Sequence, residues 1–70
     1  MTEIKAPMRG KVAEIRVRPG DTVREDDEVL VLHSMKTEVF VYSPGDGVVR
    51  ELHVKQNDLV EERAVLMVLE

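Results

Sequence analysis

The residue in the most distinctive chemical setting is Lys36, which follows Met35 between two β-prone runs, Val29–Leu32 and Glu38–Tyr42. So short a connection between two such runs predicts a tight hairpin. Tight hairpins favour pairs that contain Gly, because their central residues need positive φ, yet residues 34–37 include no Gly, Asn, Asp or Pro. Places where the local sequence conflicts with the required geometry are often functional. A separate enzyme can deprotonate and acylate a lysine amine on such a turn, which would extend its side chain into a longer arm.

No other group of residues in the sequence matches the pattern of a metal site or a catalytic site. His33 and His53 are far apart in the pattern and lack partners at metal-ligand spacing. The acidic run Asp26–Glu28 lacks the alternating ligands and the Gly of a calcium loop, so we expect a solvated turn there. Cysteine is absent, and no Ser/His/Asp or Cys/His set can be assembled. We therefore expect no metal site and no catalytic residue, so that the chain is not an enzyme by itself.

The composition indicates one small globular domain. The 70 residues are 43% hydrophobic and 34% charged, which suits a single hydrophobic core. The net charge of −4 argues against a general nucleic-acid binder, whose affinity comes from cationic contacts to phosphates. No apolar run is long enough to cross a bilayer, and the N-terminus has no secretory signal pattern. We expect a cytoplasmic protein that binds neither nucleic acid nor membrane.

An internal repeat indicates which elements position the hairpin. An offset of 37 residues places Pro7 on Pro44 and Gly10 on Gly47. The other identical pairs are Val12/Val49, Glu14/Glu51, Val17/Val54, Asp21/Asp58, Val23/Val60, Glu25/Glu62, Val31/Val68 and Leu32/Leu69. The copies are residues 1–33 and 38–70, and only the hairpin 34–37 lies outside them. A twofold operation maps this hairpin onto the gap between the chain ends. We therefore expect both termini at one end of the domain and Lys36 at the opposite end.

Both copies are predicted to consist of short strands and turns. Two runs that alternate with period two predict half-buried strands, and two continuous apolar runs predict strands covered on both faces. The alternating runs are Ala13–Val17 and Arg50–Val54, the continuous ones are Val29–Leu32 and Val65–Leu69, and Glu38–Tyr42 and its counterpart Met1–Lys5 complete the set. Residues 22–25 and 58–61 match helix capping boxes, from which a single turn at most is expected. Short strands at regular spacing predict an all-β flattened barrel or sandwich.

Four stretches spread over the chain resemble the biotinyl/lipoyl carrier domain family. They are Ala6–Gly10 (APMRG), Pro19–Val23 (PGDTV), Leu30–Lys36 (LVLHSMK) and Ser43–Val49 (SPGDGVV). The resemblance implies that residues 1–70 are one carrier domain, a flattened barrel-sandwich of two four-stranded antiparallel sheets with the pseudo-twofold repeat. Asp26 and Arg63 stand at turn positions where the family usually has Gly, so we expect those turns to be strained or built differently.

The same resemblance implies a function and a set of site residues. It makes Lys36 the residue that carries covalent biotin, with Ser34, Met35 and Thr37 as its neighbours in the attachment motif. Biotin protein ligase would attach the biotin, a biotin carboxylase would carboxylate it with ATP and bicarbonate, and a carboxyltransferase would pass the carboxyl group to an acceptor such as an acyl-CoA. The domain would be a mobile substrate shared by these enzymes. Met35 would be a recognition contact for the ligase or the carboxylase.

Three alternatives remain open from the residues. A lipoyl carrier of a 2-oxoacid dehydrogenase or glycine cleavage system is one, although Met35 directly before Lys36 favours biotin over lipoate. Met35 would alternatively cap the core. A small SH3-like or KOW-type barrel that binds RNA is the third, with Phe40 and Tyr42 as a base-stacking platform, but the acidic total and the repeat argue against it. Its phosphate contacts would come from the early basic residues Lys5, Arg9, Lys11, Arg16, Arg18 and Arg24.

Overall fold

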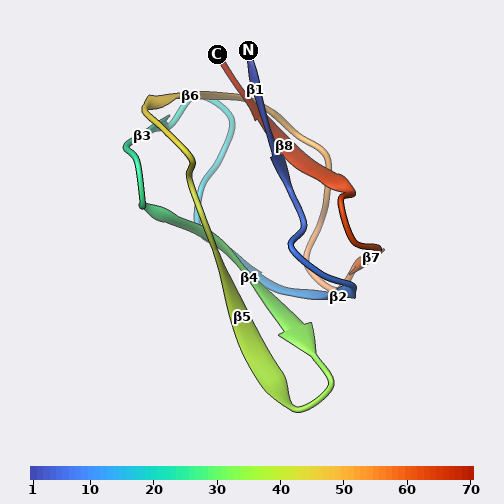
Figure 1. Cartoon of the computed structure of the whole chain (residues 1–70). Coiled ribbons are helices and arrows are strands. Elements are labelled where there is room, and N and C mark those ends of the chain that lie inside the picture. The colour runs from blue at the N-terminus through green and yellow to red at the C-terminus, as the bar shows by residue number, and fades with distance from the viewer.

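Every regular element of the protein is a β-strand, as seen in a computed structural model that describes residues 1–70. The strands are β1 Thr2–Lys5, β2 Gly10–Ile15, β3 Thr22–Val23, β4 Glu28–Ser34, β5 Thr37–Tyr42, β6 Gly47–Leu52, β7 Leu59–Val60 and β8 Val65–Leu69. They form two four-stranded antiparallel sheets, with the orders β1-β8-β6-β3 and β5-β4-β2-β7 (Figure 1). The predicted fold class is therefore confirmed. No helix of a length and apolarity that would cross a membrane is present.

The two halves are interlocked about a pseudo-twofold axis. The 37-residue offset converts β1, β2, β3 and β4 into β5, β6, β7 and β8, and it converts the strand order of one sheet into that of the other. Backbone hydrogen bonds follow the same rule. The N–H of Gly20 donates to the carbonyl of Val49 at 2.7 Å, and the N–H of Asn57 donates to the carbonyl of Val12 at 2.7 Å. Each half thus supplies a turn that binds a strand of the other half.

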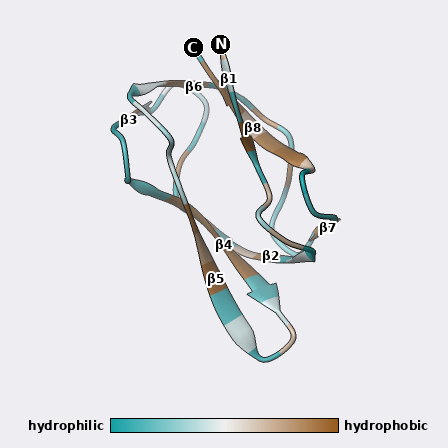
Figure 2. Cartoon of the chain, viewed as in Figure 1, coloured by the Kyte–Doolittle hydropathy of each residue, from teal (hydrophilic) through white to brown (hydrophobic).

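The core lies between the two sheets and is aliphatic. Fourteen buried residues form one cluster, in which the largest fully buried side chains are Leu30, Leu32, Leu66 and Met67. Figure 2 shows hydrophobic residues along β8 and where β4 and β5 meet the barrel. Val31 and Val68 are also buried, although they stand outside the cluster. The expectation that the continuous apolar runs are covered on both faces is confirmed for Val29–Leu32, all four of which are buried.

The alternating strands begin and end earlier than the hydrophobic pattern predicts. The prediction of strands at Ala13–Val17 and Arg50–Val54 is wrong at both ends, since β2 begins at Gly10 and β6 at Gly47. A β-carbon at Gly10 would lie 3.0 Å from the carbonyl oxygen of His33, so the missing side chain lets these backbones approach. Register shifts follow, between residues 12 and 14 in β2 and between residues 49 and 51 in β6. Each bulge shifts the alternation of inward- and outward-facing side chains by one residue. The first residues of each strand therefore do not fit the hydrophobic pattern of the rest.

Left-handed backbone shapes the turns, and it does so in symmetric pairs. Gly20 (φ 98°) corresponds to Asn57 (φ 78°), and Asp26 (φ 69°) corresponds to Arg63 (φ 70°). The expected strain at Asp26 and Arg63 is therefore present, because residues with a β-carbon lose roughly 1–2 kcal/mol in the left-handed helical region. The segments that match capping boxes form no helical turn, since residues 22–23 and 59–60 are the short strands β3 and β7.

The chain ends and the β4–β5 hairpin lie at opposite ends of the molecule. Thr2 pairs with Leu69 in the first sheet, which brings the two termini together. Figure 1 shows both termini at one end and the β4–β5 turn at the other. The predicted placement of Lys36 far from the chain ends is confirmed.

Candidate functional site

The predicted site residues lie together at the tip of the β4–β5 hairpin. Ser34 ends β4 and pairs with Thr37, the first residue of β5, so Met35 and Lys36 form a two-residue turn. The register continues without a break from this pair down to Leu30 and Val41 in the core. Buried residues of β4 and β5 therefore anchor the base of the hairpin.

The turn differs in one respect from the expected geometry. Met35 has a φ of 58°, and Lys36 is not among the residues with positive φ. The expectation of positive φ at both central residues is therefore wrong. Positive φ at the first central position alone is the pattern of a type II′ turn, which also matches the twist of a hairpin. Met35 occupies the position where this turn prefers Gly. The conflict between residue type and turn geometry is therefore confined to Met35.

Both central side chains are presented to solvent. Met35 is 94% exposed, so the alternative in which it caps the core is wrong. Lys36 is exposed as well, and no carboxylate lies within ion-pair distance of its Nζ. The amine is therefore unobstructed and fits a group joined to it through an amide. The turn therefore presents the Lys36 amine to solvent.

A shallow hollow of about 410 Å³ lies beside the hairpin, and the sequence reasoning missed it. The hollow is lined by Arg9 and Lys11, by Ser34 and Met35 of the hairpin, and by Leu59, which is 80% exposed. Leu59 reaches this place because β7 pairs with the start of β2, opposite Lys11. The match of residues 58–60 to residues 21–23 in the repeat indicated that the segment around Leu59 is structured. A strand of two residues is too short to show a periodic pattern, so β7 could not be recognised from the sequence.

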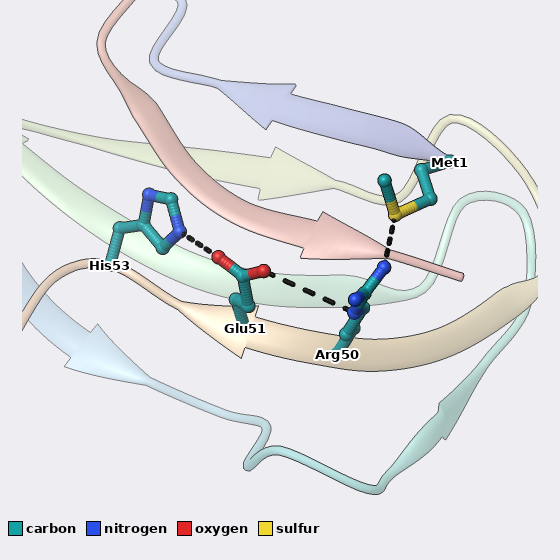
Figure 3. Close-up of polar contacts among 4 residues, drawn as sticks. All are labelled: Met1, Arg50, Glu51 and His53. Atoms are coloured by element: carbon teal, nitrogen blue, oxygen red, sulfur yellow. Dashed lines mark hydrogen bonds and ion pairs between the residues drawn. The ribbon is translucent and has the colours of Figure 1, made fainter.

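The two histidines come from different parts of the fold, and no metal cluster is present. His33 ends up on β4 near the hairpin, whereas His53 follows β6. No group of three or more His, Cys, Asp or Glu side chains is arranged to hold a metal ion. His53 instead bonds Glu51, with 2.7 Å between Nε2 and Oε1 (Figure 3). Arg50 approaches the other oxygen of Glu51 at 4.0 Å and also contacts the Met1 sulfur.

We expect the pKa of Glu51 to rise toward an ordinary glutamate value in a His53→Ala variant. The hydrogen bond from His53 lowers the pKa of this carboxyl, partial desolvation opposes the shift, and the charges of His53 and Arg50 lower it further. A depressed pKa in the folded state contributes stability above the ordinary pKa of about 4.3, and this contribution is lost as the pH falls through the folded value. Carbon-detected NMR titration of the Glu51 carboxyl measures both pKa values. Equal values in parent and variant would contradict the assignment.

Half of the early basic residues are engaged in surface ion pairs. Three of the six are in ion pairs on the surface: Lys5 with Glu3 at 3.8 Å, Arg9 with Glu61 at 3.5 Å and Arg16 with Glu28 at 3.0 Å. Phe40 and Tyr42, the proposed stacking platform, lie on β5 and are partly exposed. Their side chains are on the surface of the sheet, and acidic residues accompany them, which disfavours an approach by phosphates.

A solvent-exposed lysine at the tip of a hairpin, opposite the chain ends of a barrel built from two symmetric halves, is the arrangement of a carrier domain. The chain belongs to the biotin/lipoyl family, whose model, described as "Biotin-requiring enzyme", matches residues 2–69. The predicted family is confirmed.

Three relatives illustrate the range of proteins that the chain is similar to. It is 38% identical over 68 residues to mitochondrial pyruvate carboxylase of Mus musculus, covering 97% of this chain and 6% of that protein. It is 41% identical over 73 residues to the dihydrolipoyllysine-residue acetyltransferase component of pyruvate dehydrogenase complex of Cupriavidus necator, covering 97% of this chain and 13% of that protein. Among solved structures, the urea carboxylase of Kluyveromyces lactis matches with a TM-score of 0.92 and 26% identity, covering 99% of this chain and 6% of that one. The chain thus spans only a small part of each.

Proposed function

We propose that this protein is a biotin carrier domain and that Lys36 is its attachment residue. Biotin, joined by an amide to Nζ of Lys36, supplies a ureido nitrogen that can take up and release a carboxyl group. The observation that carries the proposal is the unpaired, exposed amine at the end of the molecule farthest from the termini. Biotin protein ligase, a biotin carboxylase and a carboxyltransferase are the partners in this proposal. The pyruvate carboxylase and urea carboxylase similarities support it.

The residues around Lys36 present the arm and keep it off the barrel. The Ser34–Thr37 pair closes the turn, and buried residues of β4 and β5 hold the base of the hairpin. Met35, with positive φ and a solvent-exposed side chain, is proposed as a recognition contact for the enzymes that act on Lys36. Because none of these residues moves a proton or attacks a substrate, the chemistry belongs to the partner enzymes.

A lipoyl carrier is the second candidate. One relative at 41% identity is a dihydrolipoyllysine-residue acetyltransferase component, so the fold alone does not distinguish the two groups. Lipoate would occupy the same amine through the same kind of bond. The two candidates therefore differ in which ligase recognises the hairpin.

Intact-mass spectrometry after incubation with each ligase separates the candidates. The chain is incubated with biotin protein ligase, biotin and ATP, and in parallel with lipoate ligase, lipoate and ATP. The proposal expects a single biotin adduct from the first reaction and no adduct from the second. A lipoyl adduct without a biotin adduct would make lipoate the proposed cofactor. A chain that stays unmodified in both reactions would contradict the carrier function.

Met35→Gly is expected to raise stability while slowing biotinylation. Glycine relieves the left-handed backbone at φ 58°, for a net gain of about 0.5–1 kcal/mol after its greater freedom in the unfolded chain is counted. The proposed recognition contact is lost with the side chain. Thermal unfolding and the rate of ligase labelling measure the two effects in one preparation. A variant that is labelled at the parental rate would show that Met35 is a turn residue only.

A further inference from the structure

The only two aromatic side chains of the protein lie on its surface rather than in its core. Phe40 is 42% exposed and Tyr42 is 52% exposed. Both belong to β5, an edge strand, and their spacing of two residues puts them on one side of it. A small domain gains most stability by burying its largest apolar side chains, so their exposure points to a role other than packing.

The repeat provides an internal control for this position. The offset of 37 residues relates Phe40 to Glu3 and Tyr42 to Lys5 on β1. Glu3 and Lys5 are exposed and form an ion pair of 3.8 Å. The same position of the same fold is therefore filled by charged residues in one copy and by aromatic residues in the other. The fold does not require the aromatic pair.

The aromatic pair borders a groove between the two sheets. The groove has a volume of about 370 Å³ and lies between β5, with Phe40 and Tyr42, and β1, with Glu3 and Lys5. As both β1 and β5 are edge strands, every second backbone N–H and C=O on their outer sides lacks a partner in the sheet. We call this place the aromatic groove. It offers apolar contacts, ring faces and free backbone groups to a partner.

Carboxylates outnumber cations on the face of the sheet that carries the aromatic pair. Glu38 is on the same side of β5 as Phe40, Glu28 pairs with Tyr42, and Glu14 is opposite Val31, which pairs with Phe40. The cation Arg16 is already occupied, at 3.5 Å from Glu14 and 3.0 Å from Glu28. Lys11 lies on this face too, since it pairs with His33, which pairs with Glu38. With the paired Glu3 and Lys5 of the groove, four carboxylates stand beside three cations. A complementary partner therefore brings positive charge, and arginine suits it because its guanidinium also stacks on aromatic rings.

The aromatic groove is close to Lys36 without obstructing it. Phe40 is four residues beyond Lys36 along β5, which corresponds to about 13 Å at strand spacing. A partner seated on the groove would leave the hairpin tip free to enter an active site. We propose that the aromatic groove is the docking surface for the biotin carboxylase, which contacts it with an arginine set among apolar side chains. Because that enzyme must attract the bicarbonate anion, positive charge near its active-site entrance is expected. This inference rests on the proposed function.

The test exchanges the aromatic pair for the residues of the other copy. In the double variant Phe40→Glu/Tyr42→Lys, β5 receives the ion pair that β1 already carries. With the biotinylated chain as substrate of a purified biotin carboxylase, we expect KM for the carrier to rise at least about tenfold with kcat unchanged. The carboxylation rate of free biotin stays the same, because the groove is not involved. The parental KM should also rise with ionic strength.

Two further measurements keep the result unambiguous. Titration of the unmodified parent with the carboxylase, followed by amide NMR signals, should perturb Phe40 and Tyr42 even though no biotin is attached. Val48→Thr, which alters an exposed apolar residue on β6 of the other sheet, is the matched control and should keep the parental KM. If the double variant unfolds, Tyr42→Thr is used, with an expected rise of about threefold.

Several outcomes would overturn the docking proposal. They are an unchanged KM, an equal rise in Val48→Thr, and an effect confined to the carboxyltransferase step. A folded double variant that the ligase no longer labels would also overturn it, because the groove would then be read by the ligase. Failure of the parent itself to accept biotin is a separate result, and it would count against the proposed function.

Discussion

Replacing Lys36 with alanine is expected to abolish biotinylation completely. The amine is the nucleophile in amide formation, and no neighbouring side chain on the hairpin can substitute for it, since Ser34, Met35 and Thr37 lack an amine. The fold should be unaffected, because Lys36 is exposed and forms no ion pair. Intact-mass spectrometry after ligase treatment measures the loss, and circular dichroism checks the fold.

Another exposed lysine of the chain provides the matched control for Lys36→Ala. Lys55→Ala removes another exposed lysine, which stands well away from the hairpin in the sequence, and it should be labelled like the parent. Lys36→Arg keeps the charge and most of the length but not the acylatable amine, so it should also remain unlabelled. An adduct on Lys36→Ala would assign the biotin to another residue and would remove the hairpin from the proposed function.

Leu30→Ala is expected to destabilise the domain nearly to the point of unfolding. Leu30 is 0% exposed and lies in the middle of β4, between Ile15 and Val41 on the neighbouring strands. Truncating a fully buried leucine costs about 2–5 kcal/mol, whereas a chain of this length has a total stability of roughly 4–10 kcal/mol. The unfolding temperature should fall by at least about 10 °C. Differential scanning calorimetry measures the change.

Leu59→Ala is the matched control for this prediction. It removes the same atoms from a side chain that is 80% exposed, so the free energy of unfolding should change by no more than about 0.5 kcal/mol. A loss of similar size in both variants would show that the aliphatic cluster between the sheets is not the main source of stability.

The repeat made most of the fold predictable from the sequence. Because residues such as Val12 and Val49 must occupy equivalent positions, one copy checks the other, and the exclusion of residues 34–37 located the hairpin and its distance from the termini. The rest was hidden for local reasons. Gly10 and Gly47 begin strands that bulges then shift in phase, and β3 and β7 are too short to produce a period.

The site was only partly accessible to the same reasoning. The position of Lys36 followed from its connection between two β-prone runs, but the turn type depends on backbone angles that the pair Met35-Lys36 does not indicate. Predicting the aromatic groove would have required knowledge of the strand order, because β1 and β5 are distant in sequence and lie at the edges of different sheets. Phe40 and Tyr42 alternate like residues of any half-buried strand.

The exchange of turns between the halves explains how a nearly symmetric molecule acquires polarity. Two separate half-chains assembled in this way would have two equivalent poles, each with a pair of loose ends. One covalent linkage, residues 34–37, closes one pole into a loop and leaves the other open. The loop is the only segment without a symmetry mate. A modifying enzyme that recognises this loop would therefore find one recognition site per molecule. We expect at most one modified lysine on each barrel for that reason.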